Sequence, residues 1–294
     1  MNTITSPTQE YGVGERLGAT DSFNLYECQL PDGSPAILKI AASPEANGIL
    51  DREAFVLQML LERADYIEAK AASEEPEKGS MGYRCFFPHL VESFISLDQG
   101  GRRISILGFA EVALKLGELA PLPHLLSLEH VRVDPKTSVW IMGKLLKLLD
   151  FAHSIGCTVP AIGENILINR DRHTVTVFDW IESTITDGPV LPEIASREIA
   201  QAAREVIIAL GGEPTTGQLP ADPDLEDEWY QEMLMSLASG EYTNAGEAHT
   251  LFYQFVRSRW PSKFHPFAAY PVRIVEKPKT HETETTATTE TTEE

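Results

Sequence analysis

The sequence predicts an α+β protein with two parts, a small β-rich part that contains one helix and a larger, mainly helical part. Three patterns predict this class: strand-like runs between turn residues in the first third, helical periodicity over most of the remainder, and one short hairpin within the helical part. The expected divisions are a flexible leader at 1–11, the β-rich part at 12–110, the helical part at 111–272 and a Thr- and Glu-rich tail at 273–294. We expect the tail to be disordered because it has almost no apolar side chains.

The β-rich part is expected to contain two hairpins with a helix between them. Turn residues at 31–33 separate the strands of the first hairpin, and turn residues at 98–101 separate those of the second. The helix between them has apolar residues at helical spacing. The expected ranges, in chain order, are 24–30, 35–41, 45–71 for the helix, 86–97 and 102–112.

The helical part opens with a clear helix start. Asp134 is a capping residue, and Pro135 occupies the first helical position, where its missing N–H is tolerated. This helix is expected to end near Gly156, and a short hairpin follows. The expected ranges after it are 165–169 and 174–180 for the strands, then 192–210, 224–239 and 245–259 for further helices.

The composition excludes several classes of protein. The formal net charge is −20, so the chain repels the phosphates of nucleic acids and an anionic membrane surface, and we expect neither as a partner. The three cysteines, at 28, 85 and 157, are too few and too far apart for a disulfide framework or a zinc site. Without a signal-like segment or a long apolar run, a cytoplasmic location is expected.

Four short segments, in chain order, are similar to motifs of the Ser/Thr protein kinase superfamily. Residues 36–39 (Ala-Ile-Leu-Lys) resemble the strand that carries the kinase Val-Ala-Ile-Lys motif, and Glu53 lies in the helix that follows. Residues 153–168 resemble the segment that runs through the catalytic loop. Residues 177–180 (Val-Phe-Asp-Trp) stand where kinases have Asp-Phe-Gly, in a form closer to the aminoglycoside phosphotransferases. The resemblance spans about residues 12–260 and implies a two-lobed kinase-like fold.

The resemblance implies a site for ATP and Mg²⁺. Lys39 would contact the phosphates, and Glu53 would pair with Lys39 and hold it in place. Asn165 and Asp179 would be the Mg²⁺ ligands, because this ion prefers carboxylate and amide oxygens. Each of these residue types is common in purely structural roles, so only their joint order along the chain favours a site.

The same resemblance gives two more contacts to the nucleotide. The adenine would lie against the backbone of Leu107, Gly108 and Phe109, between the two lobes. Gly18 would be the first glycine of the loop over the phosphates. His153 matches a kinase histidine that packs and forms hydrogen bonds, so no catalytic role is expected for it.

The sequence departs from the kinase pattern at the residues that matter most for catalysis. Pro160 lies five residues before Asn165, at the position of the catalytic Asp, and proline has no acid–base group. Ile162 replaces the lysine that contacts the transferred phosphate. In the glycine loop, Phe23 replaces the third glycine and Asp21 adds a negative charge, so ATP binding is expected to be weak or altered.

Three functions remain open on this basis. The first is a pseudokinase that binds ATP and Mg²⁺ and acts through an unidentified protein partner. The second is an unusual nucleotide-dependent transferase, a phosphotransferase or nucleotidyl transferase, for which Glu182 and Asp21 are candidate carboxylates. The third is a scaffold domain that binds no nucleotide.

A further departure from the kinase pattern is the short segment between Asp179 and Pro192, which leaves little chain for a protein-substrate platform. Glu198, in the helix that follows, stands roughly where kinases have an Asp.

Overall fold

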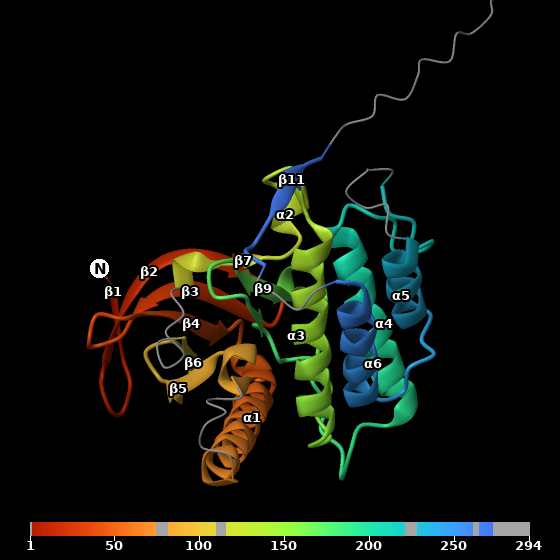
Figure 1. Cartoon of the computed structure of the whole chain (residues 1–294). Helices are drawn as coiled ribbons and strands as arrows, with labels where there is room; N and C mark the ends of the chain where they lie inside the picture. The colour runs from red at the N-terminus through yellow and green to blue at the C-terminus, as the bar shows by residue number, and fades with distance from the viewer. Residues whose placement is uncertain (1, 75–81, 110–115, 221–227, 261–264, 273–294) are drawn as a thin grey trace, which may run out of the picture.

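The chain folds as an α+β protein, as the sequence predicts. The computed structural model describes residues 2–74, 82–109, 116–220, 228–260 and 265–272. A curled sheet and the long helix α1 form one side of the molecule, and a bundle of helices forms the other (Figure 1). The expected boundary at 110 and the expected tail at 273–294 lie outside the described residues.

The sheet has six strands that are all antiparallel to their neighbours. Their order across the sheet is β1-β2-β3-β4-β6-β5, so the two hairpins expected from the sequence lie side by side through β4 and β6. The strand bounds are Asn2–Thr5 (β1), Glu10–Ala19 (β2), Phe23–Gln29 (β3), Pro35–Ala41 (β4), His89–Ser96 (β5) and Arg102–Gly108 (β6).

The structure differs from the flexible leader expected at 1–11. Strand β1 pairs with β2, and the side chain of Tyr11 is fully buried. The hydroxyls of Ser6, Thr8 and Tyr11 donate to one Glu92 oxygen at 2.8, 2.9 and 2.6 Å. Glu92 lies on β5, at the opposite edge of the sheet, so these bonds hold the sheet in its curl. The polar composition of the leader indicated disorder. The sequence gave no sign of the order that forms, because the partner that holds the leader lies more than 80 residues away along the chain.

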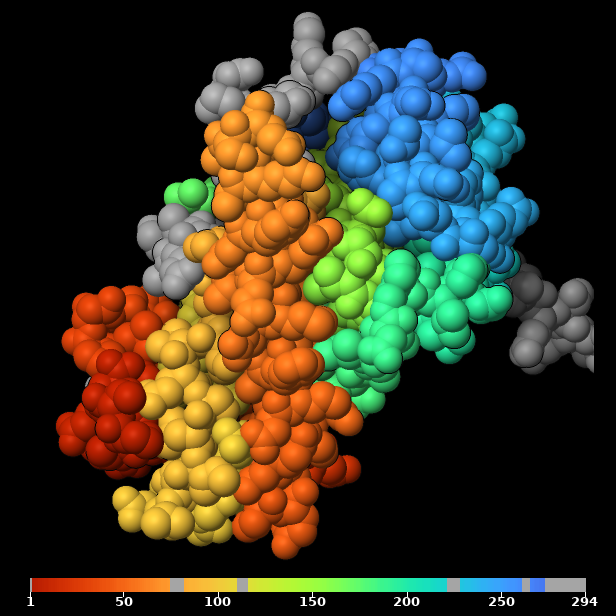
Figure 2. Space-filling model, turned by 90° about the horizontal axis from the view of Figure 1, so that it is seen from below, coloured from red at the N-terminus to blue at the C-terminus, as the bar shows by residue number. Residues whose placement is uncertain are grey.

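Helix α1 (Asn47–Glu74) covers one face of the sheet and confirms the predicted helix. Its first residue is anchored, because the Asn47 side chain donates to Gly101 O at 2.9 Å and accepts from Arg103 N at 2.7 Å. The buried stripe of α1 consists of Leu50, Glu53, Val56, Leu57, Leu60 and Ala64. Figure 2 shows the outer side of α1 exposed, with part of α3 visible between α1 and α6. A buried glutamate in an apolar stripe requires a partner.

Four longer helices build the rest of the molecule, at the predicted places. Asp134 caps α3 by accepting from Thr137 N at 2.7 Å, as the sequence indicated. The almost fully buried α3 packs against α4 and α6, and α4 packs against α5 (Figure 1). The expected start of α5, at 224–227, lies outside the described residues. The bounds are Pro135–His153 (α3), Pro192–Ala209 (α4), Glu228–Ala238 (α5) and Ala245–Arg259 (α6).

Short strands connect the two sides. The predicted hairpin is present as β9 and β10, and β9 also pairs with β7. Strand β11 pairs with β8 and ties the end of the described chain to the start of α3. The short elements β7, β8, β11 and α2 were not predicted, because no turn signal marks them; β9 and β10 are equally short, but the polar turn at 170–173 between them indicated the hairpin. Their bounds are Leu119–Pro121 (β7), His124–Ser127 (α2), Val131–Val133 (β8), Ile166–Asn169 (β9), Thr174–Val177 (β10) and Ala269–Pro271 (β11). Within the described residues, no helix combines the length and the apolar character needed to cross a bilayer.

Candidate functional site

The alternation of β4 places Lys39 on the face of the sheet that α1 covers. Leu38 and Ile40 point to the opposite face, into the small core inside the curled sheet. Ile37 and Ala41, on the same side as Lys39, pack with residues of α1. The Lys39 side chain is fully buried, so its ammonium group needs anionic partners.

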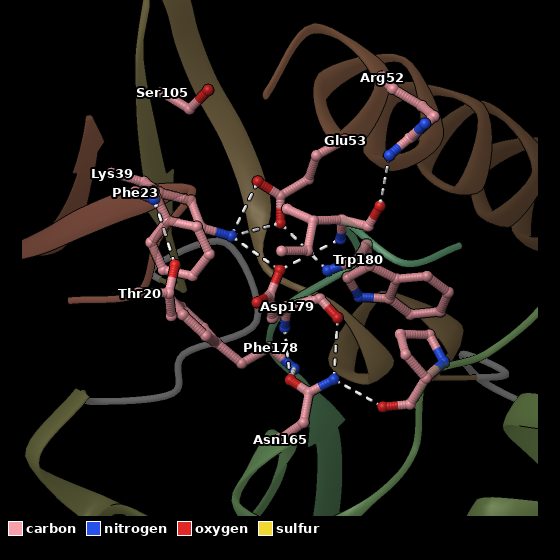
Figure 3. A network of polar contacts seen from close by, with 12 residues as sticks. Thr20, Phe23, Lys39, Arg52, Glu53, Ser105, Asn165, Phe178, Asp179 and Trp180 are labelled. Carbon is pink, nitrogen blue, oxygen red and sulfur yellow. Dashed lines mark hydrogen bonds and ion pairs between the residues drawn. The ribbon is translucent and has the colours of Figure 1, made fainter. Parts of the chain in front are cut away.

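Lys39 finds two carboxylates from distant parts of the chain (Figure 3). Its Nζ donates to Glu53 Oε1 at 2.7 Å, to Glu53 Oε2 at 3.0 Å and to Asp179 Oδ1 at 2.8 Å. An ammonium group has three protons, and these three bonds use all of them. The three residues, which we call the ion triad, join β4, α1 and the segment after β10. The sequence predicted the contact between Lys39 and Glu53, and the structure shows it.

The segment after β10 is locked to the ion triad by its own backbone. Glu53 Oε1 accepts from Trp180 N at 3.1 Å, and Asp179 Oδ1 accepts from Ile181 N at 3.1 Å. Trp180 is fully buried and donates its indole N–H to Val177 O at 2.9 Å. Arg52, next to Glu53 on α1, donates to Ile181 O at 3.0 Å. These bonds fix where the Asp179 carboxylate points.

Asn165 acts as a clamp between two backbone segments. Its amide nitrogen donates to Pro160 O at 2.6 Å and to Asp179 O at 2.8 Å. Its side-chain oxygen accepts from Phe178 N at 3.2 Å and Asp179 N at 2.6 Å. Phe178 N also donates to the backbone oxygen of Asn165 at 3.1 Å, so the side-chain oxygen has Asp179 N as its main partner and is directed at backbone N–H groups in this conformation. The structure brings Asn165 to Asp179 as expected but gives it backbone partners.

A second buried contact holds the segment around Pro160. Glu198 on α4 accepts from His153 Nε2 at 2.7 Å and from Val159 N at 3.0 Å. His153 is nearly buried at the end of α3, so it packs and forms a hydrogen bond, as expected from the sequence. Pro160 is thereby held beside Asn165, and its ring brings no titratable group to the site.

An aromatic ring covers the Lys39 amine on the side of the β2–β3 turn. The ring centroid of Phe23 lies 4.0 Å from Lys39 Nζ, a cation–π distance, and Phe23 is only 3% exposed. The turn that carries Phe23 is tight, because Thr20 N donates to Phe23 O at 2.8 Å and the Thr20 hydroxyl accepts from Phe23 N at 3.2 Å. The Phe23 ring and the two carboxylates together enclose the Lys39 amine. A phosphate group is therefore sterically blocked from reaching it.

The other residues expected at a nucleotide lie in the sheet. Gly18 lies in β2, opposite Leu25, rather than in a loop. Leu107 and Gly108 lie in β6, which has β4 on one side and β5 on the other. The Phe109 side chain is buried. Residues 110–115, which follow Phe109, lie outside the described residues.

This conformation does not fit ATP and Mg²⁺ at the ion triad. A phosphate could reach Lys39 only by displacing a carboxylate or the Phe23 ring, and a metal ion would find the Asn165 oxygen directed at backbone N–H groups. Asp179 is 25% exposed, and among the residues that the structure describes the hydrogen bonds that its carboxylate accepts go to Oδ1. Within the residues that the structure describes, no group of three or more His, Cys, Asp or Glu side chains could hold a metal ion.

Electrostatics decides how the ion triad behaves. Burial raises the pKa of the Glu53 carboxyl above its ordinary value, the Lys39 ammonium opposes this shift, and the negative charge of Asp179 adds to it. One cation thus faces two carboxylates. The positive charge of Lys39 offsets the free-energy cost of bringing both negative charges together away from water. The arrangement is suited to holding structural elements together.

Sequence patterns missed the contacts that only folding creates. Phe23 was noticed as a bulky residue in a glycine position, but nothing indicated that its ring would cover Lys39. The link from Arg52 to Ile181 had no signal, and Glu198 had only its position in α4. Comparison of this chain with known protein families and with curated proteins gave no match.

Proposed function

We propose that the chain is a kinase-like module that performs no phosphotransfer and acts through contacts with a protein partner. The observation that carries this proposal is the ion triad, in which Lys39 bonds both Glu53 and Asp179, beside a proline at the position of the catalytic base. A kinase-like two-lobed arrangement accounts for this pairing, in which the curled sheet and α1 form the small lobe and the helices form the large one.

Three further contacts support the kinase-like interpretation. The Lys39–Glu53 pair joins a strand to the helix that follows it, as in the family that the sequence resembles. Asn165 contacts the backbone of Asp179, so the two residues expected at a metal lie together. Glu198 supports the segment before Pro160 from α4. These contacts come from segments in the expected chain order.

The lack of catalysis follows from chemistry at Pro160. Proton transfer by a positioned side chain contributes about 10²–10⁴-fold in enzymes, and proline supplies none. Ile162 is 52% exposed and provides no positive charge for a transferred phosphate. Asp21 and Glu182, the candidate carboxylates for an unusual transferase, are both exposed, and no contact within the described residues favours that function.

ATP binding, in this proposal, requires an open state in which the Phe23 ring leaves Lys39. A ligand that binds only the open state has its affinity reduced by the fraction of molecules that are open. We therefore expect Mg-ATP at about 1 mM to change the melting temperature of the native chain by less than about 1 °C. Phe23→Ala should increase the shift caused by Mg-ATP, although it lowers the starting stability.

A matched set of variants tests this proposal. Phe55→Ala removes a phenylalanine that is 61% exposed on α1 and should leave the effect of Mg-ATP unchanged. Asp179→Ala in the Phe23→Ala background should abolish any Mg²⁺-dependent shift. Phosphate and AMP transfer to the chain or to added protein should be undetectable. Robust transfer that Lys39→Ala abolishes would refute the proposal of an inactive module, and a large shift of the native chain would refute closure by Phe23.

A further inference from the structure

One face of helix α3 is basic, although the chain as a whole is strongly acidic. Fourteen of the 19 residues of α3 are buried, and the five that are not lie on a single face of the helix. This face has three lysines and one aspartate, whereas the whole chain has 24 basic and 44 acidic residues. The five residues are Lys136, Trp140, Lys144, Lys147 and Asp150.

Two neighbouring segments add further cations to this face. Arg172 is exposed in the turn between β9 and β10, and the histidine after it stacks on Trp140 with ring centroids 4.8 Å apart. On α6, the Tyr253 hydroxyl lies against α3 at Gly143, and the Arg257 guanidinium lies 5.5 Å from the Tyr253 ring centroid. We call the five cations the basic stripe, which consists of Lys136, Lys144, Lys147, Arg172 and Arg257.

The cations of the basic stripe lie close enough to influence one another. Burial and the neighbouring charge of Lys144 lower the pKa of the Lys147 ammonium. Burial also lowers the pKa of His249 on α6; the charges of Lys147, Arg257 and Lys144 lower it further, and the one aspartate of the α3 face opposes them. Among the described residues, Lys144, Arg172 and Arg257 form no ion pair with a carboxylate. An anionic ligand would therefore relieve repulsion between these cations.

The length of the basic stripe limits the size of a ligand. Figure 2 shows part of α3 accessible between α1 and α6. From Lys136 to Lys147, the stripe runs about 16 Å along α3, at about 1.5 Å per residue. An extended peptide covers this length with about five residues. A short segment that concentrates its negative charges within that length therefore fits the stripe.

We propose that the basic stripe binds a short acidic segment of a protein partner, with its carboxylates at Lys144, Lys147 and Arg172. This proposal rests on the proposed function, in which the chain acts through a protein partner, and it names the chemistry of that partner. The net charge of −20 disfavours long polyanions such as nucleic acids, because their phosphates continue past the stripe over an acidic protein. The same repulsion makes the stripe selective for segments whose acidic residues are close together.

A fluorescein-labelled pentaglutamate is the probe for the basic stripe, and a labelled pentaglutamine is its neutral counterpart. Titration of the full chain at about 20 mM salt, followed by fluorescence anisotropy, should show saturable pentaglutamate binding with Kd on the order of 100 μM. Raising the salt to about 0.3 M should weaken this binding about tenfold, and pentaglutamine should not bind. In NMR spectra, the indole signal of Trp140 on α3 should shift with pentaglutamate, whereas that of Trp229 on α5 should not.

Charge-reversal variants separate the basic stripe from the overall charge of the chain. Lys144→Glu/Arg172→Glu should weaken pentaglutamate binding about tenfold, and its melting temperature should stay close to that of the native chain because neither side chain has an ion pair to lose. Arg16→Glu/Arg204→Glu is the matched control, because it changes the net charge equally at exposed positions on β2 and α4. The control should change the affinity by less than about twofold. An equal loss in both variants, or absent binding at about 1 mM chain, would overturn the proposal.

The same titration distinguishes two other occupants. The chain has its own glutamates near its end, at 282, 284, 290, 293 and 294, but threonines separate most of them. Replacing these five with glutamine should change the affinity for pentaglutamate by less than about twofold; a gain of about tenfold would show that the chain's own end occupies the stripe and would overturn the proposal of a partner. A twenty-nucleotide oligothymidylate should bind more weakly than pentaglutamate, and tighter binding would overturn the proposal in favour of a nucleic acid. The transfer assays do not involve the stripe, so absent binding together with absent transfer would reject the stripe alone.

Discussion

Replacing Lys39 with methionine should expose how the ion triad stabilises the fold. The side chains have similar length and the site is fully buried, so the main change is the loss of one charge and three hydrogen bonds. Two carboxylates would then face each other without a cation. Breaking a buried ion pair by removing one partner costs about 3–5 kcal/mol in free energy of unfolding.

The two carboxylates do not share this cost equally. Glu53 is 1% exposed and, among the described residues, would keep the Trp180 N–H as its one donor, whereas Asp179 is 25% exposed and can be rehydrated. Most of the cost should therefore come from Glu53. The double variant Lys39→Met/Glu53→Gln should be more stable than Lys39→Met alone, by about 1–3 kcal/mol. Lys39→Met/Asp179→Asn should recover less.

Urea unfolding, followed by tryptophan fluorescence and by circular dichroism, measures these differences. A loss of 3–5 kcal/mol corresponds to a lower melting temperature by roughly 6–20 °C for a chain of this size. Lys70→Met is the matched control, since Lys70 and Glu74 are 55% and 63% exposed at 3.9 Å, and an exposed pair contributes about 0–1 kcal/mol. If Lys39→Met costs no more than Lys70→Met, or if neither double variant recovers stability, the triad does not hold the fold together.

The deficit of Lys39→Met should also depend on pH. Burial already raises the pKa of Glu53, and removing Lys39 removes the influence that lowers it. A carboxyl whose pKa is raised on folding stabilises the fold below its unfolded pKa, about 4.3, and this stabilisation is lost as pH rises through the folded pKa. The stability difference between the native chain and Lys39→Met should therefore grow as the pH rises above the unfolded pKa towards neutral pH. A difference that shrinks over this range would contradict the reasoning.

Two further predictions concern titrating groups outside the triad. Burial and the hydrogen bond to Glu92 raise the pKa of Tyr11 to about 12, from about 10 in the unfolded chain, so stability should fall as pH rises between these values. Other buried thiols and phenols also have raised pKa values, so both proteins should lose stability between about pH 9 and pH 11 in urea unfolding, and the loss should be about 1 kcal/mol larger in the native chain than in Tyr11→Phe; an equal loss in both would refute it. Burial raises the pKa of all three thiols, to about 11 for Cys28 and about 12 for Cys157, and Cys85 differs in being only half-buried, so thiol reagents should label Cys85 first, as mass spectrometry would show. Earlier labelling of either buried thiol in the folded chain would contradict this order.

Sequence patterns were sufficient for the longer helices and for strands β3 to β6, but they did not predict the ten-residue strand β2. Helices such as α3 have a capping residue, a proline at the first position and a long apolar period, and each signal is local. Strands β3 to β6 were readable because turn residues separate them. The leader was not readable, because its order comes from Glu92 on a strand far along the chain. A polar segment can be ordered by hydrogen bonds to one buried or half-buried side chain far along the chain, and its own sequence then carries no pattern that predicts this order.

The candidate site was predictable only where its residues belong to elements that are neighbours along the chain. Lys39 and Glu53 belong to consecutive elements, so the expectation that they meet needed only a strand packed against the next helix. Asn165 was expected as a metal ligand, whereas its oxygen accepts two backbone N–H groups. A residue type cannot show which of several partners it will bond, because that choice depends on distances set by folding.

By itself, the sequence determined the α+β class, the places of the longer helices and of strands β3 to β6, and the proline where the resemblance would place a catalytic base. These features follow from local periodicity, turn residues and the identity of a single side chain. Only the tertiary structure decided that Lys39 is enclosed by Glu53, Asp179 and the Phe23 ring, and that cations from three separate segments form one basic stripe. Enclosure and surface patches depend on how distant segments pack, and no local pattern of residues carries that information.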